Sequence, residues 1–418
     1  MNIVNSQLIK ELNETRILNL VRSEGTISRV ELAKRTRISK VAVSDIVSRL
    51  IEAGYITEIG KGESTKKGGK RPTLLKLLPN NGFVVGIEIH SSYAKVALAN
   101  LNSEIISENV VPYATGDTIV HVLPKITALL DSMLKKKPVY RKKLISIGIA
   151  VPGFIDYEKG EIAFAVTIHG WVQHPLASVF SERYRVPVLI ENDVNARTYG
   201  EHLLGAGQDT DNLVCIWLGE GLGAGIIVDG NLIRGRYGSA GELGYLELGH
   251  HLTNPALVKN LYTNQHRFGS IMREQHLLDT IKLKIQYDKH LSHQDVENLK
   301  LEDLLSDEQH EYTAIVREIL DEYAMLLSIL CTDLIKTLNT SKIVLSGKIV
   351  ENSEYLLDKC RQIVQENMHN IPFKATPIEM GTLKEEGCMK GIISMALQVI
   401  FEPLLKTRSF KKASIHYQ

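Results

Sequence analysis

The sequence is poor in the features that mark secreted, metal-binding or membrane proteins. Its four cysteines in 418 residues are too few and too widely spaced for a disulfide framework or a Cys-x-x-Cys metal or redox pair. We therefore expect buried, reduced thiols. No apolar run approaches the roughly 20 residues of a membrane span, and the polar N-terminus, with Asn2 and Asn5, does not resemble a secretory signal. These absences favour a cytoplasmic protein that does not bind a membrane.

Net charge is also nearly absent, at +1, but the charge is unevenly distributed. Residues 1–78 contain 15 Lys+Arg and 8 Asp+Glu, a net of +7, whereas the remainder contains 34 and 40, a net of −6. A basic head on an acidic body is typical of a chain in which one domain meets nucleic acid. The length and the apolar content of 44% allow two or three domains.

Three helices are predicted in the head, residues 1–78. Apolar residues at helical spacing place the first over about 7–23. Ser28 and Glu31 have the spacing of a capping box, which begins a short second helix. A continuous apolar stripe predicts the third helix over 40–53.

A two-stranded wing is predicted to follow. Residues 55–59 and 73–78 have strand character and flank a basic, glycine-containing loop that ends at Pro72. Glycines let such a loop enter a minor groove or clamp phosphates, although lysine-rich loops also serve solubility alone. Three helices and a wing are typical of a winged helix-turn-helix domain.

The polar side of the third helix is expected to face DNA. Small residues let a helix backbone approach base edges, while Lys and Arg reach phosphates or guanine. The residues expected to contact DNA are Arg37, Ser39, Lys40, Ala42, Ser44, Asp45, Arg49, Lys70 and Arg71. A small helical bundle used for protein contacts is the alternative.

Beyond residue 81, short apolar runs alternate with helical patterns. Strands are predicted over 83–89, 95–99, 145–151, 186–190, 213–218, 223–228 and 343–345, and helices near 118–136, 194–205, 310–338 and 351–367. Alternation of this kind indicates α/β layers with helices against mixed sheets.

Several motifs of the body occur in a specific order. They are Val151-Pro152-Gly153-Phe154-Ile155-Asp156, Gly170-Trp171, Glu191-Asn192-Asp193, Gly219 to Gly225, Gly235 to Gly244, and Gly381 to Gly391. As a set they resemble the ROK family (repressors, open reading frames and kinases) over nearly the full length. The head resembles that of the family's xylose and N-acetylglucosamine type repressors.

The resemblance implies an actin-like, sugar-kinase fold of two α/β lobes around a cleft. The lobes would be residues 79–195 and 196–380, with 381–418 packing back on the first. It assigns a sugar ligand to Gly153, Thr167, Asn192, Asp193, Glu242 and Tyr245. Thr167 and Tyr245 replace an Asn and a His of the family, which implies a pocket unlike that of glucose kinases.

Asp193 matches the carboxylate that accepts the proton of the attacking sugar hydroxyl in ROK kinases. Here its role need only be hydrogen bonding to the sugar. The residues Glu191-Asn192-Asp193 alone would equally suit the cap of a helix that begins near Val194.

The motifs that would hold ATP depart from the family pattern at three places. His90 stands where a glycine would let phosphate approach the backbone, and Glu220 replaces a threonine hydroxyl with an anion. Ser346-Gly347-Lys348 replaces a Gly-Gly pair and is expected to fill space that the base or ribose needs. We therefore expect no catalytic residue and no cofactor.

The family's cysteine-containing zinc segment is also missing, and Tyr245 replaces a histidine that would be a ligand. We expect no metal. Four histidines nearby leave an unusual all-histidine site open, namely His250, His251, His266 and His276.

Together these features predict a sugar-responsive, sequence-specific transcriptional repressor of carbohydrate-utilisation genes. It would bind a two-fold symmetric operator in double-stranded DNA as a homodimer or homotetramer. The alternatives are an active ATP-dependent sugar kinase and a regulator that answers to a protein partner. The sequence names neither the sugar nor the direction of its effect on DNA binding.

Overall fold

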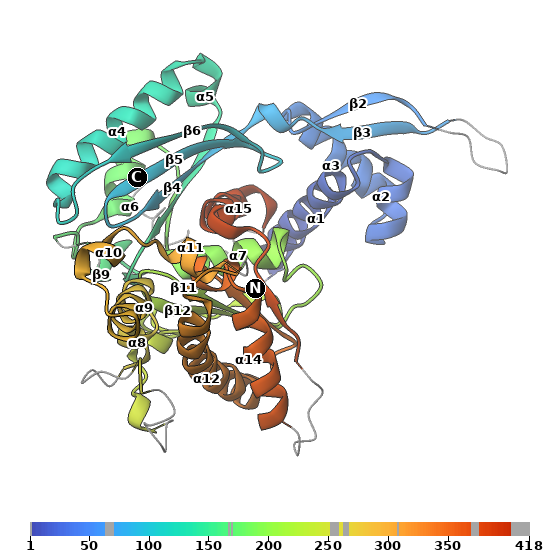
Figure 1. Ribbon diagram of the computed structural model, residues 1–418. Helices are drawn as coiled ribbons and strands as arrows, with labels where there is room; N and C mark the ends of the chain where they lie inside the picture. The colour runs from blue at the N-terminus through green and yellow to red at the C-terminus, as the bar shows by residue number, and fades with distance from the viewer. Residues whose placement is uncertain are drawn as a thin grey trace. The chain divides into compact units, whose positions relative to one another are not determined.

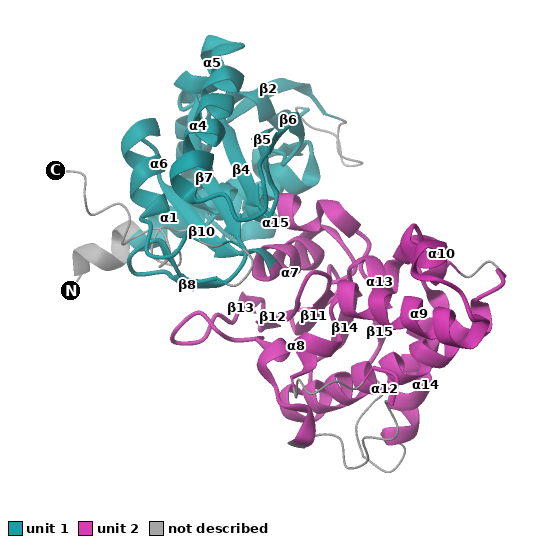
Figure 2. Cartoon of the chain, turned by 60° about the vertical axis from the view of Figure 1, so that its left-hand side comes forward, with its two compact units in different colours: residues 1–193, 392–418 teal, residues 194–391 magenta. Residues whose placement is uncertain are grey.

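The computed structural model contains two compact units, residues 1–193 with 392–418 and residues 194–391 (Figure 2). It describes the chain except for residues 1, 63–70, 166–167, 169, 251–258, 262–266, 307–308, 369–375 and 403–418, and except for the side chains of residues 2–7 and 250. None of the described helices is both long and apolar enough to cross a bilayer.

The head is a winged helix-turn-helix, as predicted. Its elements are α1 (Asn2–Glu24), β1 (Ile27–Ser28), α2 (Arg29–Thr36), α3 (Lys40–Glu52), β2 (Ile56–Lys61) and β3 (Thr73–Leu77). Strands β2 and β3 run side by side as the wing (Figure 1). The predicted apolar stripe of α3 is buried at Val43, Ile46, Val47 and Leu50.

Two serine caps begin the short helices of the head. The Ser28 hydroxyl accepts from the amide of Glu31 at 3.2 Å, as expected, while the Glu31 carboxylate lies 3.4 Å from Arg35. The Ser39 hydroxyl accepts from the amide of Ala42 at 3.2 Å. Each cap satisfies a backbone donor that lacks an intrahelical acceptor, so both helix starts are fixed locally.

The rest of the first unit is built on a five-stranded mixed sheet. Its order is β10-β7-β4-β5-β6, with β4 (Phe83–Ile89), β5 (Tyr93–Asn100), β6 (Ile105–Pro112), β7 (Leu144–Val151) and β10 (Val188–Asn192). The first three strands of this order are parallel, and β4, β5 and β6 are antiparallel. A small hairpin, β8 (Phe154–Asp156) with β9 (Glu161–Phe164), lies outside this sheet.

Helices cover both faces of this sheet. On one face, α4 (Ile119–Lys135) and α6 (Leu176–Tyr184) share a core with Ile147 and Ile149 of β7. On the other face, the Ser146 hydroxyl donates to the carbonyl of Ala396 at 2.7 Å. Ala396 belongs to α15 (Gly387–Phe401), so the last described helix closes this unit. The short α5 (Pro138–Lys142) precedes β7.

The second unit repeats the same sheet topology. Its order is β13-β12-β11-β14-β15, with β11 (Leu213–Leu218), β12 (Leu222–Val228), β13 (Asn231–Leu232), β14 (Lys342–Ser346) and β15 (Ile378–Met380). In both sheets three consecutive antiparallel strands are followed by two parallel ones. This duplication agrees with the α/β body that was predicted.

Long helices bury one face of the second sheet. They are α9 (Glu274–Lys289), α12 (Thr313–Leu338) and α14 (Glu354–Asn367), and the largest apolar cluster of the protein lies among them. The remaining helices are α7 (Asp193–Leu204), η2 (Leu243–Tyr245), α8 (Phe268–Ile271), α10 (His293–Glu297), α11 (Leu301–Leu305) and α13 (Lys348–Glu351), with further 3-10 turns at Pro79–Asn81, Leu248–His250 and Lys384–Glu386.

The compact units divide the chain differently from the predicted domains. The boundaries fall at 193/194 and 391/392, and the head belongs to the same unit as the first sheet. The chain returns to the first unit within α15. The first five residues of this helix group with the second unit, and the others pack on the first sheet. Domain boundaries at 78, 195 and 380 stay a prediction.

Candidate DNA-binding and sugar-binding sites

The polar side of α3 is open to solvent. Ser39, Lys40, Ser44 and Asp45 are exposed, and Ala42 is half-buried. Arg37 is exposed in the turn before the helix, with a φ of 59° that is left-handed for a residue other than glycine. The backbone thus places six predicted contact residues, five of them exposed, on one stretch, as a recognition helix requires.

The three other predicted DNA contacts are Arg49, Lys70 and Arg71. The Arg49 guanidinium is 3.4 Å from the Glu14 carboxylate of α1, which holds it against the head. Arg71 is exposed just before β3, and Lys70 lies outside the described residues. The roles of all three in DNA binding stay predictions.

Sequence reasoning missed Val41, whose side chain is 72% exposed in the first turn of α3. The two sides of the helix were predicted from residue type alone. Val41, an apolar residue outside the apolar stripe, was therefore assigned to neither side. A helical projection would have found it, since 41 lies angularly between 44 and 45.

The sugar-side residues of the first unit converge at the end of β10. The Asn192 amide donates to the carbonyl of Gly153 at 3.1 Å, and Glu191 is buried and accepts from the Tyr157 hydroxyl. Gly153 has a φ of 105°, and a Cβ there would lie 2.4 Å from the Phe164 carbonyl oxygen. Only glycine fits this position, so Asn192 and Gly153 are fixed next to each other.

Asp193 is the first residue of α7. A carboxylate there is stabilised by the helix dipole, so the helix-cap interpretation and the sugar-binding one are both compatible with its place. Thr167, another predicted ligand-binding residue, lies outside the described residues.

In the second unit, Glu242 and Tyr245 lie on the turn that follows β12 and β13. Burial, and then the negative charge of Glu242, raise the pKa of Tyr245, whereas Arg267 opposes the shift. The Arg267 guanidinium lies over the Tyr245 ring at 5.5 Å. A Cβ on Gly241 would lie 1.7 Å from the Ala224 carbonyl oxygen. The turn is thereby held against β12, and it presents a carboxylate and a phenol together.

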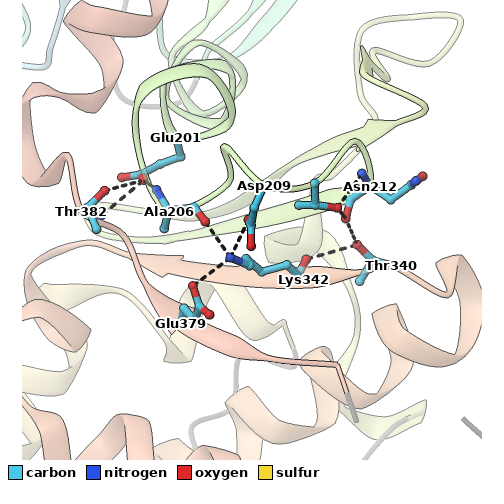
Figure 3. Close-up of polar contacts among 9 residues, drawn as sticks. Glu201, Ala206, Asp209, Asn212, Thr340, Lys342, Glu379 and Thr382 are labelled. Atoms are coloured by element: carbon cyan, nitrogen blue, oxygen red, sulfur yellow. Dashed lines mark hydrogen bonds and ion pairs between the residues drawn. The ribbon is translucent and has the colours of Figure 1, made fainter. Parts of the chain in front are cut away.

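A network of polar contacts fixes the C-terminal end of α7 (Figure 3). The buried Lys342 ammonium of β14 contacts Ala206, Asp209 and Glu379 at 2.9, 2.8 and 3.0 Å. Burial lowers the pKa of Lys342, but the two carboxylates outweigh it and raise it overall. The buried Glu201 of α7 accepts from the amide of Ala206 at 2.9 Å. These contacts anchor the helix whose first residue is Asp193.

Family models match both parts of the chain. A winged helix-turn-helix DNA-binding model covers residues 11–57, and the ROK family model covers residues 84–263. The chain therefore contains a ROK family domain behind a winged helix-turn-helix head.

Relatives named as a repressor or a transcriptional regulator align over most of the chain. A xylose repressor of Caldicellulosiruptor bescii is 29% identical over 401 residues, which is 94% of this chain and 97% of the relative. The regulator NagC of Escherichia coli is 27% identical over 365 residues, 85% of each chain.

Solved ROK structures share the fold. A ROK family transcriptional regulator, a homologue of the E. coli MLC protein, superposes with a TM-score of 0.77 at 22% identity, over 97% of this chain and all of that one. A ROK glucokinase from Streptomyces griseus, solved with glucose and AMPPNP, gives 0.62 at 22% identity, over 76% of this chain and all of that one. The ROK fold therefore occurs in a named transcriptional regulator and in a glucokinase.

The second unit gathers acidic groups around Glu274. Burial raises the pKa of Glu274, and Lys348 opposes the shift. The negative charges of Glu220, Glu302 and Glu351 raise this pKa further. Lys348 is 3.1 Å from Glu302. The amide of Gly347 donates to the Glu351 carboxylate at 2.9 Å. A backbone donor that faces a carboxylate of its own helix is occupied, which leaves it unsuited to phosphate.

Ser346 is buried at the end of β14. A Cβ on Gly381 would come within 2.1 Å of its hydroxyl oxygen, so the hydroxyl packs against the start of the segment after β15. That Ser346-Gly347-Lys348 fills space needed by a base or ribose stays a prediction. The nearby change that reaches the surface is Lys348.

In the first unit, His90 is held at the end of β4. Its Nε2 is 2.9 Å from the buried Glu88 carboxylate, and its ring stacks on Tyr93 with centroids 4.1 Å apart. The Tyr113 hydroxyl donates to the carbonyls of His90 and Tyr93. The ring that replaces the ROK glycine is thus fixed in place on two sides.

Two neighbouring residues of α12 hold the chain at Asn260 and Leu261 and at Met272. Glu322 is buried and accepts from the amides of Asn260 and Leu261 at 2.8 and 3.0 Å. The Tyr323 hydroxyl donates to the Met272 carbonyl at 2.7 Å. Glu322 therefore anchors Asn260 and Leu261, and the next residue of the helix, Tyr323, anchors Met272.

Of the four histidines that left a metal site open, only the side chain of His276 is described. Its Nε2 lies 3.0 Å from the carbonyl oxygen of Leu261. Within the described residues, no group of three or more potential ligands suits a metal ion.

Proposed function

We propose that this protein is a sugar-responsive, sequence-specific repressor of carbohydrate-utilisation genes that does not phosphorylate its ligand. The observation that carries the proposal is the exposed polar side of α3 in a winged helix-turn-helix head joined to a ROK body. Lys40 and Arg71 supply phosphate contacts, while Ser44 and Asp45 face base edges.

The ligand we propose is a sugar bound through Asn192, Asp193, Glu242 and Tyr245. Paired amide and carboxylate groups donate to and accept from adjacent hydroxyls, as sugar recognition requires. Xylose and N-acetylglucosamine are the first sugars to test. The named relatives include a xylose repressor, the regulator NagC and an N-acetylglucosamine repressor of Escherichia coli.

Sugar binding would change the affinity of the head for DNA by linkage between two sites. A helix-turn-helix dimer binds two half-sites about one helical turn apart, so a change in the separation of two heads is sufficient to alter affinity. We therefore propose a homodimer, or a tetramer built from such dimers, on a two-fold operator.

A mobility-shift titration with the chain's own upstream region tests the proposal. We expect a sequence-specific complex at physiological salt in the presence of competitor DNA, and a change in its midpoint on addition of the sugar. Absence of any specific complex would exclude the DNA-binding function.

An active sugar kinase is the second candidate, because Asp193 keeps the place of the ROK catalytic base. The carboxylates around Glu274 and the occupied amide of Gly347 argue against it, since they oppose a polyanion. Calorimetry with Mg-ATP, with and without sugar, separates the two: we expect no binding heat, and ATP-dependent sugar phosphorylation would establish the kinase.

A further inference from the structure

The recognition helix carries one large apolar side chain on its exposed face, Val41. It is 72% exposed, more than any other described valine, leucine or isoleucine. The face around it consists of Lys40, Ser44, Asp45 and Ser48, all exposed and polar. The core of the head does not need Val41, because Val43, Ile46, Val47 and Leu50 already form the buried stripe.

Val41 occupies the part of the helix that reaches base edges. Ser39 caps α3, so Val41 is the second residue of the helix. In helix-turn-helix proteins the N-terminal residues of the recognition helix contact the bases. At about 100° per residue, Val41 lies between Ser44 and Asp45 in projection, at the centre of the exposed face.

Asp45 follows Val41 by four residues on the same face. Asp45 is exposed, and its own i+4 neighbour, Arg49, pairs with Glu14 of α1 at 3.4 Å. An acid on a surface that meets phosphates is unfavourable unless it accepts from a base. The major-groove amino group of cytosine is the donor that a carboxylate reads there.

We propose that Val41 contacts a thymine methyl group and that Asp45 accepts from a cytosine amino group nearby in each half-site. Apolar side chains recognise thymine by its C5 methyl. A separation of four helical residues spans about 6 Å, or roughly two base-pair steps. The inference rests on the proposed DNA-binding function and names the sequence features that it would read.

The test begins with duplexes enriched from a random pool by the full-length chain at fixed salt. Each thymine of the enriched site is then replaced in turn by deoxyuridine, which removes the methyl group alone. We expect one thymine per half-site at which replacement weakens binding about fourfold, as burial of one methyl group predicts. In Val41→Ala that replacement should no longer matter, whereas Asp45→Asn should relax the preference for the nearby cytosine.

Val30→Ala is the matched control, since Val30 is 57% exposed in the same head but lies on α2. It should keep the wild-type response to every deoxyuridine. The inference is overturned if no thymine methyl contributes, or if Val41→Ala responds as the wild type does. Failure of the chain to enrich any sequence would instead contradict the proposed function itself, so the two failures are distinguishable.

Discussion

The guanidinium of Arg22 lies over the ring of Phe401, 4.5 Å from its centroid. Arg22 belongs to the first helix of the DNA-binding head, and Phe401 ends the last described helix, α15. The Asn19 amide donates to the Phe401 carbonyl at 2.7 Å, and Arg22 also donates to Ser103 at 2.9 Å. The head is thus joined to the first sheet and to α15 within one unit.

Helix α15 connects this contact to the second unit. A Cβ on Gly391, near its start, would lie 1.7 Å from the Ala196 carbonyl oxygen of α7. The helix therefore packs closely on α7 at one end and contacts α1 at the other. We propose that α15, with these contacts at its two ends, transmits a change at α7 to the head.

We expect Arg22→Ala and Phe401→Ala to reduce the effect of the sugar on operator affinity. A cation–π contact of about 1 kcal/mol corresponds to about a fivefold loss of coupling. Sugar affinity, measured by calorimetry, should change little. Operator titrations with and without sugar give the coupling directly.

Arg16→Ala is the control for that experiment, because Arg16 is an exposed arginine of the same helix. It removes the same charge from the head, so it reports any general loss of DNA affinity. Equal coupling in Arg22→Ala and Arg16→Ala would show that the contact transmits nothing.

The buried Glu322 should contribute strongly to the stability of the fold. Glu322→Ala removes the acceptor of the Asn260 and Leu261 amides, and we expect a loss of about 3 kcal/mol in the free energy of unfolding. Glu318→Ala, one turn earlier and 44% exposed, should cost less than about 1 kcal/mol. Denaturant titration measures both.

A strong chelator tests for a metal site. In the wild-type protein it should leave the melting temperature and the sugar response unchanged. A chelator-dependent drop that zinc reverses would instead support the histidine site that the sequence left open.

The sequence carried enough information for the elements with strong local signals. The caps at Ser28 and the apolar stripe of α3 depend on neighbouring residues, and both were predicted. Strand β6 lies at the sheet edge with most of its apolar residues exposed, so its sequence lacks the pattern of a buried strand, and it was missed. Strand β1 has only two residues, too few to show a period. Such strands are fixed by pairing with distant partners.

In the candidate site, too, some features were predicted from the sequence and others depend on distant contacts. Motif order places Asn192 and Gly153 in one site, and the structure joins them at 3.1 Å. The pairing of Arg49 with Glu14, the buried side chain of Ser346 and the anchor at Glu322 depend on tertiary packing, which no local pattern encodes.

Glu274 provides a test through pH. Burial raises its pKa, so the folded state binds this proton more tightly than the unfolded state does. The stability that it contributes is therefore lost as pH rises from the ordinary value of about 4.3 through the raised value. Glu274→Gln should melt about one to two degrees above the wild type at pH 8.

This advantage of Glu274→Gln should shrink as the pH is lowered, because the wild-type carboxyl becomes protonated and then resembles the amide. Scanning calorimetry at pH 8, 6 and 5 follows the trend. Glu220→Gln, at an exposed position of the same acidic region, should show a smaller advantage. An advantage that grows toward low pH would contradict the assignment.

Asp193 tests the sugar site itself. A thermal-shift screen of mono- and disaccharides, with and without phosphate, should yield a sugar that raises the melting temperature of the wild type. Asp193→Ala should abolish this shift, because it removes the acceptor for sugar hydroxyls at the start of α7. The variant should also melt slightly lower without sugar, since it loses the favourable interaction with the helix dipole, worth about 0.3–1 kcal/mol.

Asp303→Ala separates these two effects. Asp303 lies in the first turn of α11 and is exposed, so its removal imposes a similar helix-end penalty away from the sugar side. It should keep the full sugar-induced shift. Asp193→Asn, which preserves the shape and replaces one acceptor oxygen with a donor, should retain at most a weak shift. A full shift in Asp193→Ala would mean that the sugar binds elsewhere, and that Asp193 serves only to begin α7.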